Sequence, residues 1–193
     1  MRLGLAMAVA AFLPGVVAAE DWSGLYAVLG QPKVSGDLVE YFDGAPSSAT
    51  ASLDGEFTSI ALGHNWQRQN LVYGVELGYS NGNVSLPPFP STIYLHDALD
   101  LKGRIGLAAG RVLIFATLGY SRSTHEVPEG PGGPAAGMSY GFGVDFMATD
   151  HFFFGAEVLR RNLEVDQGVS SDVPLFSYDE DMQTVGIRLG VKF

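Results

Sequence analysis

The last nine residues of the chain alternate strictly between apolar side chains and side chains that are polar or absent. The apolar positions are Val185, Ile187, Leu189, Val191 and Phe193, and the positions between them are Gly186, Arg188, Gly190 and Lys192. A two-residue period predicts a β-strand with one apolar face. That face packs on a core in a soluble protein, or against lipid in a membrane barrel, and the rest of the chain decides between the two.

Seven earlier segments show the same alternation and are separated by connections of two lengths. The predicted strands are residues 22–30, 56–66, 71–80, 97–108, 112–122, 137–147 and 152–161, followed by the closing strand. Short turns are expected at 67–70, 109–111 and 148–151, and long Gly-, Pro- and acid-rich loops at 31–55, 81–92, 123–136 and 162–178. Antiparallel neighbours joined in order place all long loops at one rim. The prediction is an all-β fold, an eight-stranded antiparallel up-and-down transmembrane β-barrel with four exposed loops.

Strand length and aromatic placement favour the membrane. Strands of about ten residues tilted by about 40° reach about 25 Å, the height of an apolar outer-membrane band. Aromatic residues concentrate near both water interfaces of such barrels. We expect one belt at the turn rim from Trp22, Trp66, Tyr73, Phe146, Phe152 and Phe193, and one at the loop rim from Phe57, Tyr79, Tyr120, Tyr140 and Tyr178.

The beginning of the chain has the layout of an export signal. Arg2 precedes an apolar run that contains Pro14 and ends in Ala18 and Ala19, before the acidic residues Glu20 and Asp21. We predict that residues 1–19 are a cleaved signal peptide and that residues 20–193 form a single barrel domain. After cleavage no apolar run is long enough for a spanning helix. The expected location is the outer membrane of a Gram-negative cell, reached through the periplasm.

The inward face of the predicted barrel mixes glycines with charges. Its charged residues are Glu76, Lys102, Arg104, Asp145, Glu157, Arg161, Arg188 and Lys192. Small residues leave room for long ones, and an unpaired buried charge costs several kcal/mol, so we expect a packed structural ionic network without a large pore. A gate in which Glu76 and Glu157 exchange partners between Arg104 and Arg188 is the alternative.

Composition excludes several other functions. With a formal net charge of -10 there is no basic face for nucleic acid. The chain has no cysteine, and its four histidines lie on different segments, so no metal site and no cofactor are predicted. We expect no catalytic residues and no enzymatic activity. Two alternatives stay open, a lipid A-modifying barrel enzyme that uses Ser123 and His125, and a soluble ligand-binding barrel of lipocalin type.

Several short motifs in this order resemble the small outer-membrane β-barrel proteins, namely the opacity-type proteins and the membrane domain of outer membrane protein A. They are residues 22–26 (WSGLY), 73–76 (YGVE), 119–120 (GY) and 186–193 (GIRLGVKF). The resemblance implies periplasmic termini, contact with outer-membrane lipids and lipopolysaccharide, and insertion by the barrel-assembly machinery. Val185, Ile187, Leu189, Val191 and Phe193 would form the insertion signal. Unlike in outer membrane protein A, we expect no peptidoglycan-binding domain after the barrel and therefore no cell-wall tether. We expect a monomer with an unknown surface partner.

Overall fold

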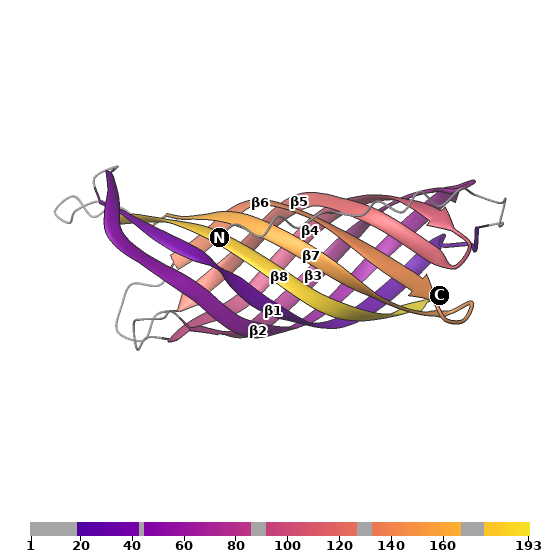
Figure 1. The fold of residues 1–193 in the computed structure, drawn as a ribbon, viewed down its shortest axis with the longest axis horizontal. Coiled ribbons are helices and arrows are strands. Elements are labelled where there is room, and N and C mark those ends of the chain that lie inside the picture. The colour runs from indigo at the N-terminus through magenta and orange to yellow at the C-terminus, as the bar shows by residue number, and fades with distance from the viewer. Residues whose placement is uncertain (1–18, 43–44, 86–91, 127–132, 167–175) are drawn as a thin grey trace, which may run out of the picture.

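Eight antiparallel strands close into one barrel in which each strand pairs with its neighbours in sequence (Figure 1). A computed structural model describes residues 19–42, 45–85, 92–126, 133–166 and 176–193. The strands are β1 (Gly24–Phe42), β2 (Ala45–Arg68), β3 (Leu71–Ser85), β4 (Thr92–Ala109), β5 (Val112–Glu126), β6 (Gly133–Met147), β7 (Phe152–Asp166) and β8 (Phe176–Lys192). The predicted fold class is confirmed. The described residues contain no helix long and apolar enough to cross a membrane.

The strand register fixes how the barrel closes. If the pairing is followed once around the wall from Ser35, through β8 and back across β2, it returns to β1 at Leu25, ten residues away. This stagger forces the strands to tilt against the barrel axis, typically by about 35–45°. Residues far apart in the sequence therefore reach the same level of the interior.

The three short connections lie at the end of the barrel that also holds the C-terminus (Figure 1), which we call the turn end. Two of them, at residues 69–70 and 110–111, have two residues, and each starts with a positive φ, 58° at Gln69 and 57° at Gly110. Such turns match the twist of the flanking strands. The third connection spans residues 148–151. All three agree with the turns expected from the sequence.

At the opposite end, which we call the hairpin end, the structure corrects the predicted loops. The strands continue well into the segments assigned to loops, and β1 and β2 extend until Phe42 pairs with Ala45. The first connection is thus a two-residue link in a long hairpin, where a loop over residues 31–55 was expected. Above the membrane both faces of a strand are wet, so apolar alternation is not required, and backbone pairing with the neighbouring strand is sufficient.

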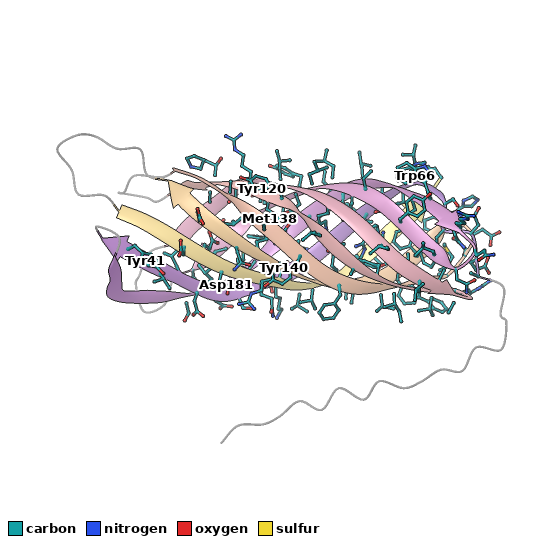
Figure 2. All side chains as sticks on the ribbon, turned by 90° about the horizontal axis from the view of Figure 1, so that it is seen from above. Tyr41, Trp66, Tyr120, Met138, Tyr140 and Asp181 are labelled. Carbon is teal, nitrogen blue, oxygen red and sulfur yellow. The ribbon has the colours of Figure 1, made fainter. Side chains whose placement is uncertain are left out.

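The outer surface is apolar and bounded by aromatic side chains (Figure 2). Leu62, Ile187 and Leu189 are at least 60% exposed, as expected for a face covered by lipid. The exposed aromatic residues of the predicted belts are Trp66, Tyr73, Phe146, Phe152 and Phe193 at the turn end and Tyr120 and Tyr140 toward the hairpin end. The side chain of Tyr178 lies outside the described part of the structure.

Trp22 and Phe57 were assigned to the belts, and this was wrong because both point inward. Trp22 precedes β1, and its backbone N–H donates to Gln67 Oε1 at 2.7 Å. Its ring lies 5.8 Å from that of Phe153 inside the barrel. Phe57 is buried at the hairpin end, where it packs with Val34 and Met182. The two aromatic residues therefore seal the interior.

The interior is layered along the barrel axis. An apolar cluster, which we call the turn-end plug, contains Trp22, Tyr26, Val28, Val72, Ala108, Leu113, Phe115, Met147 and Phe153. A second apolar cluster, the hairpin-end plug, contains Val34, Leu53, Phe57, Val84, Ala135, Leu163 and Met182. Charged residues occupy the space between the plugs. The proposed signal peptide lies outside the described residues, except for Ala19.

Candidate functional site

The charged layer fits inside the barrel because glycines in the wall leave space for large inward side chains. A Cβ atom on Gly63 would overlap the ring of Tyr26, and a Cβ atom on Gly143 would overlap the ring of Phe115. Both rings border the charged residues. The glycine-rich inward face therefore accommodates side chains from neighbouring strands.

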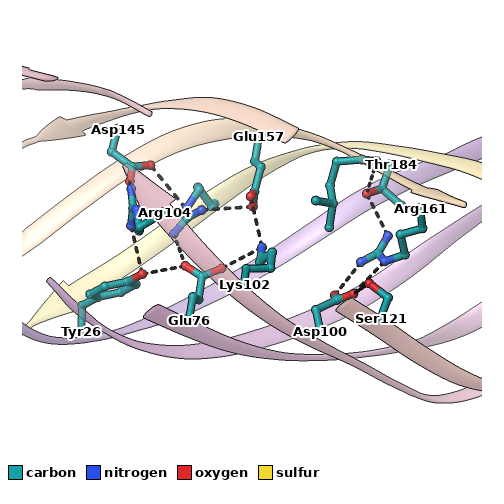
Figure 3. A network of polar contacts seen from close by, with 12 residues as sticks. Tyr26, Glu76, Asp100, Lys102, Arg104, Ser121, Asp145, Glu157, Arg161 and Thr184 are labelled. Atoms are coloured by element: carbon teal, nitrogen blue, oxygen red, sulfur yellow. Dashed lines mark hydrogen bonds and ion pairs between the residues drawn. The ribbon is translucent and has the colours of Figure 1, made fainter. Parts of the chain in front are cut away.

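Glu76, on β3, is the centre of the first ionic group (Figure 3). Its Oε1 lies 2.8 Å from Lys102 Nζ, and its Oε2 accepts hydrogen bonds from Arg188 Nη2 and the Tyr26 hydroxyl, each at 2.9 Å. Glu157 on β7 bridges the same two cations, since its oxygens lie 3.1 Å from Lys102 Nζ and from Arg188 Nη1. Two carboxylates and two cations thus form a closed ring of charge-assisted contacts.

Arg104 and Asp145 extend this ring toward the turn end. Arg104 Nη2 donates to Asp145 Oδ2 at 3.0 Å, and its Nη1 donates to the Tyr26 hydroxyl at the same distance. The guanidinium carbon also lies 3.9 Å from the centre of the Phe115 ring. Arg188 Nε reaches Asp145 Oδ1 at 3.3 Å. Tyr26 and Phe115 therefore join the ionic group to the turn-end plug by hydrogen-bond and cation–π contacts.

A second ionic group lies nearer the hairpin end. Arg161 binds Asp100 through two parallel hydrogen bonds, Nε to Oδ1 at 2.9 Å and Nη2 to Oδ2 at 2.7 Å. Ser121 donates to the same carboxylate at 2.5 Å, and Arg161 Nη1 donates to Thr184 at 3.2 Å. The bidentate geometry fixes both side chains.

Seven of the eight charged residues proposed for the lumen lie inside the barrel, and each of the seven has an oppositely charged partner there. They are Glu76, Lys102, Arg104, Asp145, Glu157, Arg161 and Arg188. The two ionic groups also include five residues that were not predicted from the sequence, namely Asp100, Tyr26, Phe115, Ser121 and Thr184. The alternation of apolar and polar residues could have identified Asp100, because it shares a strand face with Lys102 and Arg104.

Lys192 was expected to join the network, and this was wrong. Its Nζ donates to the backbone carbonyl of Asp21 at 2.5 Å, at the turn end. The Asp21 carboxylate itself accepts hydrogen bonds from the Ser23 backbone and hydroxyl, which hold its pKa below the ordinary value. Lys192 therefore contacts the segment before β1 instead of the lumen carboxylates.

The space left between the two ionic groups is small. A cavity of about 60 Å³ is bordered by Glu76, Asp100, Lys102, Arg161 and Arg188. A cavity of that size holds only a few water molecules. Because acidic and basic groups alternate around it, the cavity carries little net charge and has no single-sign lining that would select an ion.

The described residues contain no group of three or more histidines or carboxylates that could hold a metal ion. The residues weighed for a lipid A enzyme lie near the hairpin end of β5. Ser123 is buried, and β5 extends through His125, two residues further along the strand. The side chain of His125 lies outside the described part of the structure.

Comparison with known proteins identifies the family. A family model described as the outer membrane protein beta-barrel domain matches residues 3–193. The chain belongs to this family. It is similar to a 22 kDa outer membrane protein of Rhizobium leguminosarum bv. viciae, with 27% identity over 139 residues, 69% of this chain. The match covers 64% of that protein, so this chain spans less than two thirds of its length.

Solved structures agree with the fold. OprG of Pseudomonas aeruginosa superposes with a TM-score of 0.54 at 15% identity, over 91% of this chain and 99% of that one. The neisserial surface protein A gives a TM-score of 0.51 at 15% identity, over 89% and 98%. At these identities the likeness concerns the fold alone. Together with the family, it places the barrel in the outer membrane of a Gram-negative cell, where its outer face contacts lipid.

Proposed function

We propose that this outer-membrane barrel is a non-enzymatic protein of structural or surface-interaction type, with a sealed lumen and an exposed hairpin end as its contact surface. This proposal is supported by the side chains that fill the lumen. Two apolar plugs flank two ionic groups whose charges are paired, and the cavity between them measures about 60 Å³. A barrel filled in this way leaves no path for a solute to cross.

The single observation that carries the proposal is the ring formed by Glu76, Lys102, Glu157 and Arg188. Its members come from four different strands and span the barrel from one wall to the other. Opening a pore would require these buried pairs to separate, and breaking one buried pair costs about 3–5 kcal/mol. A static structural network is therefore favoured over a gate.

Conductance across a planar bilayer tests this proposal. We expect the purified, folded protein to show no large, stable channel steps. A variant with Phe115→Gly and Arg188→Gly, which removes two side chains that fill the centre, serves as the positive control and is expected to conduct more. Large and stable steps from the unaltered monomeric protein would overturn the proposal of a sealed lumen.

We infer that residues 1–19 are removed as a signal peptide and that the barrel-assembly machinery recognises the outward residues of β8, which are Val185, Ile187, Leu189, Val191 and Phe193. In support, Phe193 is 74% exposed, while its backbone N–H donates to Leu25 O at 2.9 Å next to the seam with β1. A monomer in contact with lipopolysaccharide fits this arrangement, with the termini on the periplasmic side and the hairpin end outside the cell.

A further inference from the structure

The barrel wall has a step between β2 and β3 at the hairpin end. Pairing of β2 with β3 begins at Asp54, opposite Ser85. On its other side, β2 continues to pair with β1 as far as Ala45. Within the part of the chain that the structure describes, residues 45–46 and 50–53 of β2 therefore have a strand partner on one side only, and the pairing with β1 is irregular at residues 47–49 between them. The hairpin that carries them lies at the end of the barrel opposite the C-terminus (Figure 1).

We propose that this free edge of β2 binds an extended, basic segment of another protein by β-strand addition. The idea deepens the surface-interaction role proposed above and rests on it. Unpaired N–H and C=O groups along a strand edge form a template for a further strand. The regularly paired part of the edge, residues 50–53, falls within the length range of ordinary strands, so it can form a short ladder of main-chain hydrogen bonds.

The sequence of the edge lacks the usual protection against pairing. Natural edges are blocked by charged residues, bulges or proline. This protection is absent from residues 50–53 (TASL), which contain no charge, proline or pairing irregularity, whereas Pro46 and the irregular pairing of residues 47–49 lie nearer the tip. In the neighbouring connection, residues 86–91 (LPPFPS), three of the six residues are prolines without an N–H, a composition that disfavours a ladder of main-chain hydrogen bonds.

A second copy in the same membrane is excluded as the partner by symmetry. Two barrels in one membrane are related by an axis along the membrane normal, so their β2 strands run in the same vertical direction. Symmetric pairing of two identical edges requires antiparallel strands. The partner must then approach from outside the cell.

The charge around the edge indicates a basic partner. Asp54 and Glu56 lie just below the free segment on β2, and Asp37 faces it from β1, where it pairs with Ser52. All three are exposed, and the Lys33–Glu56 contact of 3.9 Å is too exposed to neutralise Glu56. With a formal charge of -10, the chain attracts cationic segments.

Amide hydrogen exchange on the full-length protein in detergent tests the proposal. The probe is a ten-residue peptide of alternating lysine and threonine. In the free protein, every second amide of residues 50–53 should exchange fast, because alternate N–H groups of a strand point to opposite edges. Adding the probe should slow this fast set. Unchanged exchange at saturating peptide, or protection only elsewhere, would overturn the proposal.

Matched peptides and variants separate backbone pairing from charge. A probe N-methylated at every residue should not bind, and a glutamate version should bind more weakly. A shortened hairpin, in which residues 39–50 are replaced by Asn-Gly so that Leu38 and Ala51 stay paired, should bind at least about tenfold more weakly. A Ser48→Ala, Thr50→Ala protein keeps the backbone and should stay within about twofold of the original affinity.

Two other results of these experiments would also overturn the proposal. Protection of the edge that rises with protein concentration in the absence of peptide would identify a second copy as the occupant and overturn the proposal. Equal binding of the N-methylated probe would show that charge alone attracts the peptide, and this too would overturn it. Neither result would affect the sealed lumen, which the conductance measurement tests separately.

Discussion

At the scale of single residues, the effect of a charged side chain on the stability of the barrel depends on its burial and on its partners. Glu76 and Glu56 are both glutamates paired with a lysine. The side chain of Glu76 is 2% exposed and has three partners, whereas that of Glu56 is 75% exposed with one partner at 3.9 Å. A buried charge that loses its partner is left without compensation, but an exposed one is solvated by water.

Substituting these two glutamates tests that difference. Glu76→Gln should lower the free energy of unfolding by about 3–5 kcal/mol, because Lys102 and Arg188 lose a shared counter-charge. Glu56→Gln, the matched control, should change it by less than about 1 kcal/mol. Urea unfolding in lipid vesicles measures both. Equal effects of the two substitutions would show that the Glu76 network does not stabilise the barrel.

At the scale of elements, each strand is defined by its neighbours as much as by its own sequence. Strand β8 illustrates this along one outward face. Leu189 lies between Leu29 of β1 and Phe154 of β7, both exposed apolar residues, whereas Gln183 lies nearer the hairpin end between Ser35 and Arg160. The same strand face thus passes from apolar to polar neighbours, as expected where a strand leaves the hydrocarbon layer.

An arginine scan along this face tests the position of the membrane. Leu189→Arg should cost about 2–4 kcal/mol of unfolding free energy, because the charge enters the hydrocarbon layer. Gln183→Arg should cost about 0–1 kcal/mol, as expected near an interface. Folding yield and urea midpoints in vesicles provide the measurement. A neutral Leu189→Arg protein would place this part of β8 outside the hydrocarbon layer.

At the scale of the whole molecule, closure of the ring is the dominant feature. Every described strand pairs on both sides over most of its length, and β1 pairs with both β2 and β8. Because each described strand is paired on both sides, separating one pair of neighbouring strands leaves the other strand pairs in place. The barrel should behave as one cooperative unit that detergent alone does not unfold.

Gel migration before and after boiling tests this cooperativity. The unboiled protein should stay compact in detergent and migrate faster than the boiled protein, which is extended. A chain truncated before residue 185 lacks about half of the pairing of β8 with β1 and β7 and the ionic contacts of Arg188, and it should migrate identically in both states. Identical migration of the full-length protein before and after boiling would contradict a closed barrel.

Much of the fold could be predicted because its signals are local. The two-residue period assigned Leu101, Ile105 and Leu107 to the outside and Lys102 and Arg104 to the inside, and the short turns followed from a few polar residues. The hairpin end could not be predicted in this way, because strands above the membrane need no apolar face. The dipeptide Asp43-Gly44 between β1 and β2 is a recognised hairpin signal that would have indicated the extension.

The sequence by itself determined which face of each strand is apolar, which residues turn the chain, and that charged side chains lie inside. Only the tertiary structure decided which charges meet, that Trp22 and Phe57 seal the two ends, and that β2 rises above β3. The physical reason is the stagger of the closed barrel. A shift of ten residues around the ring brings Glu76, Glu157 and Arg188 together, and no local pattern along one strand contains that shift.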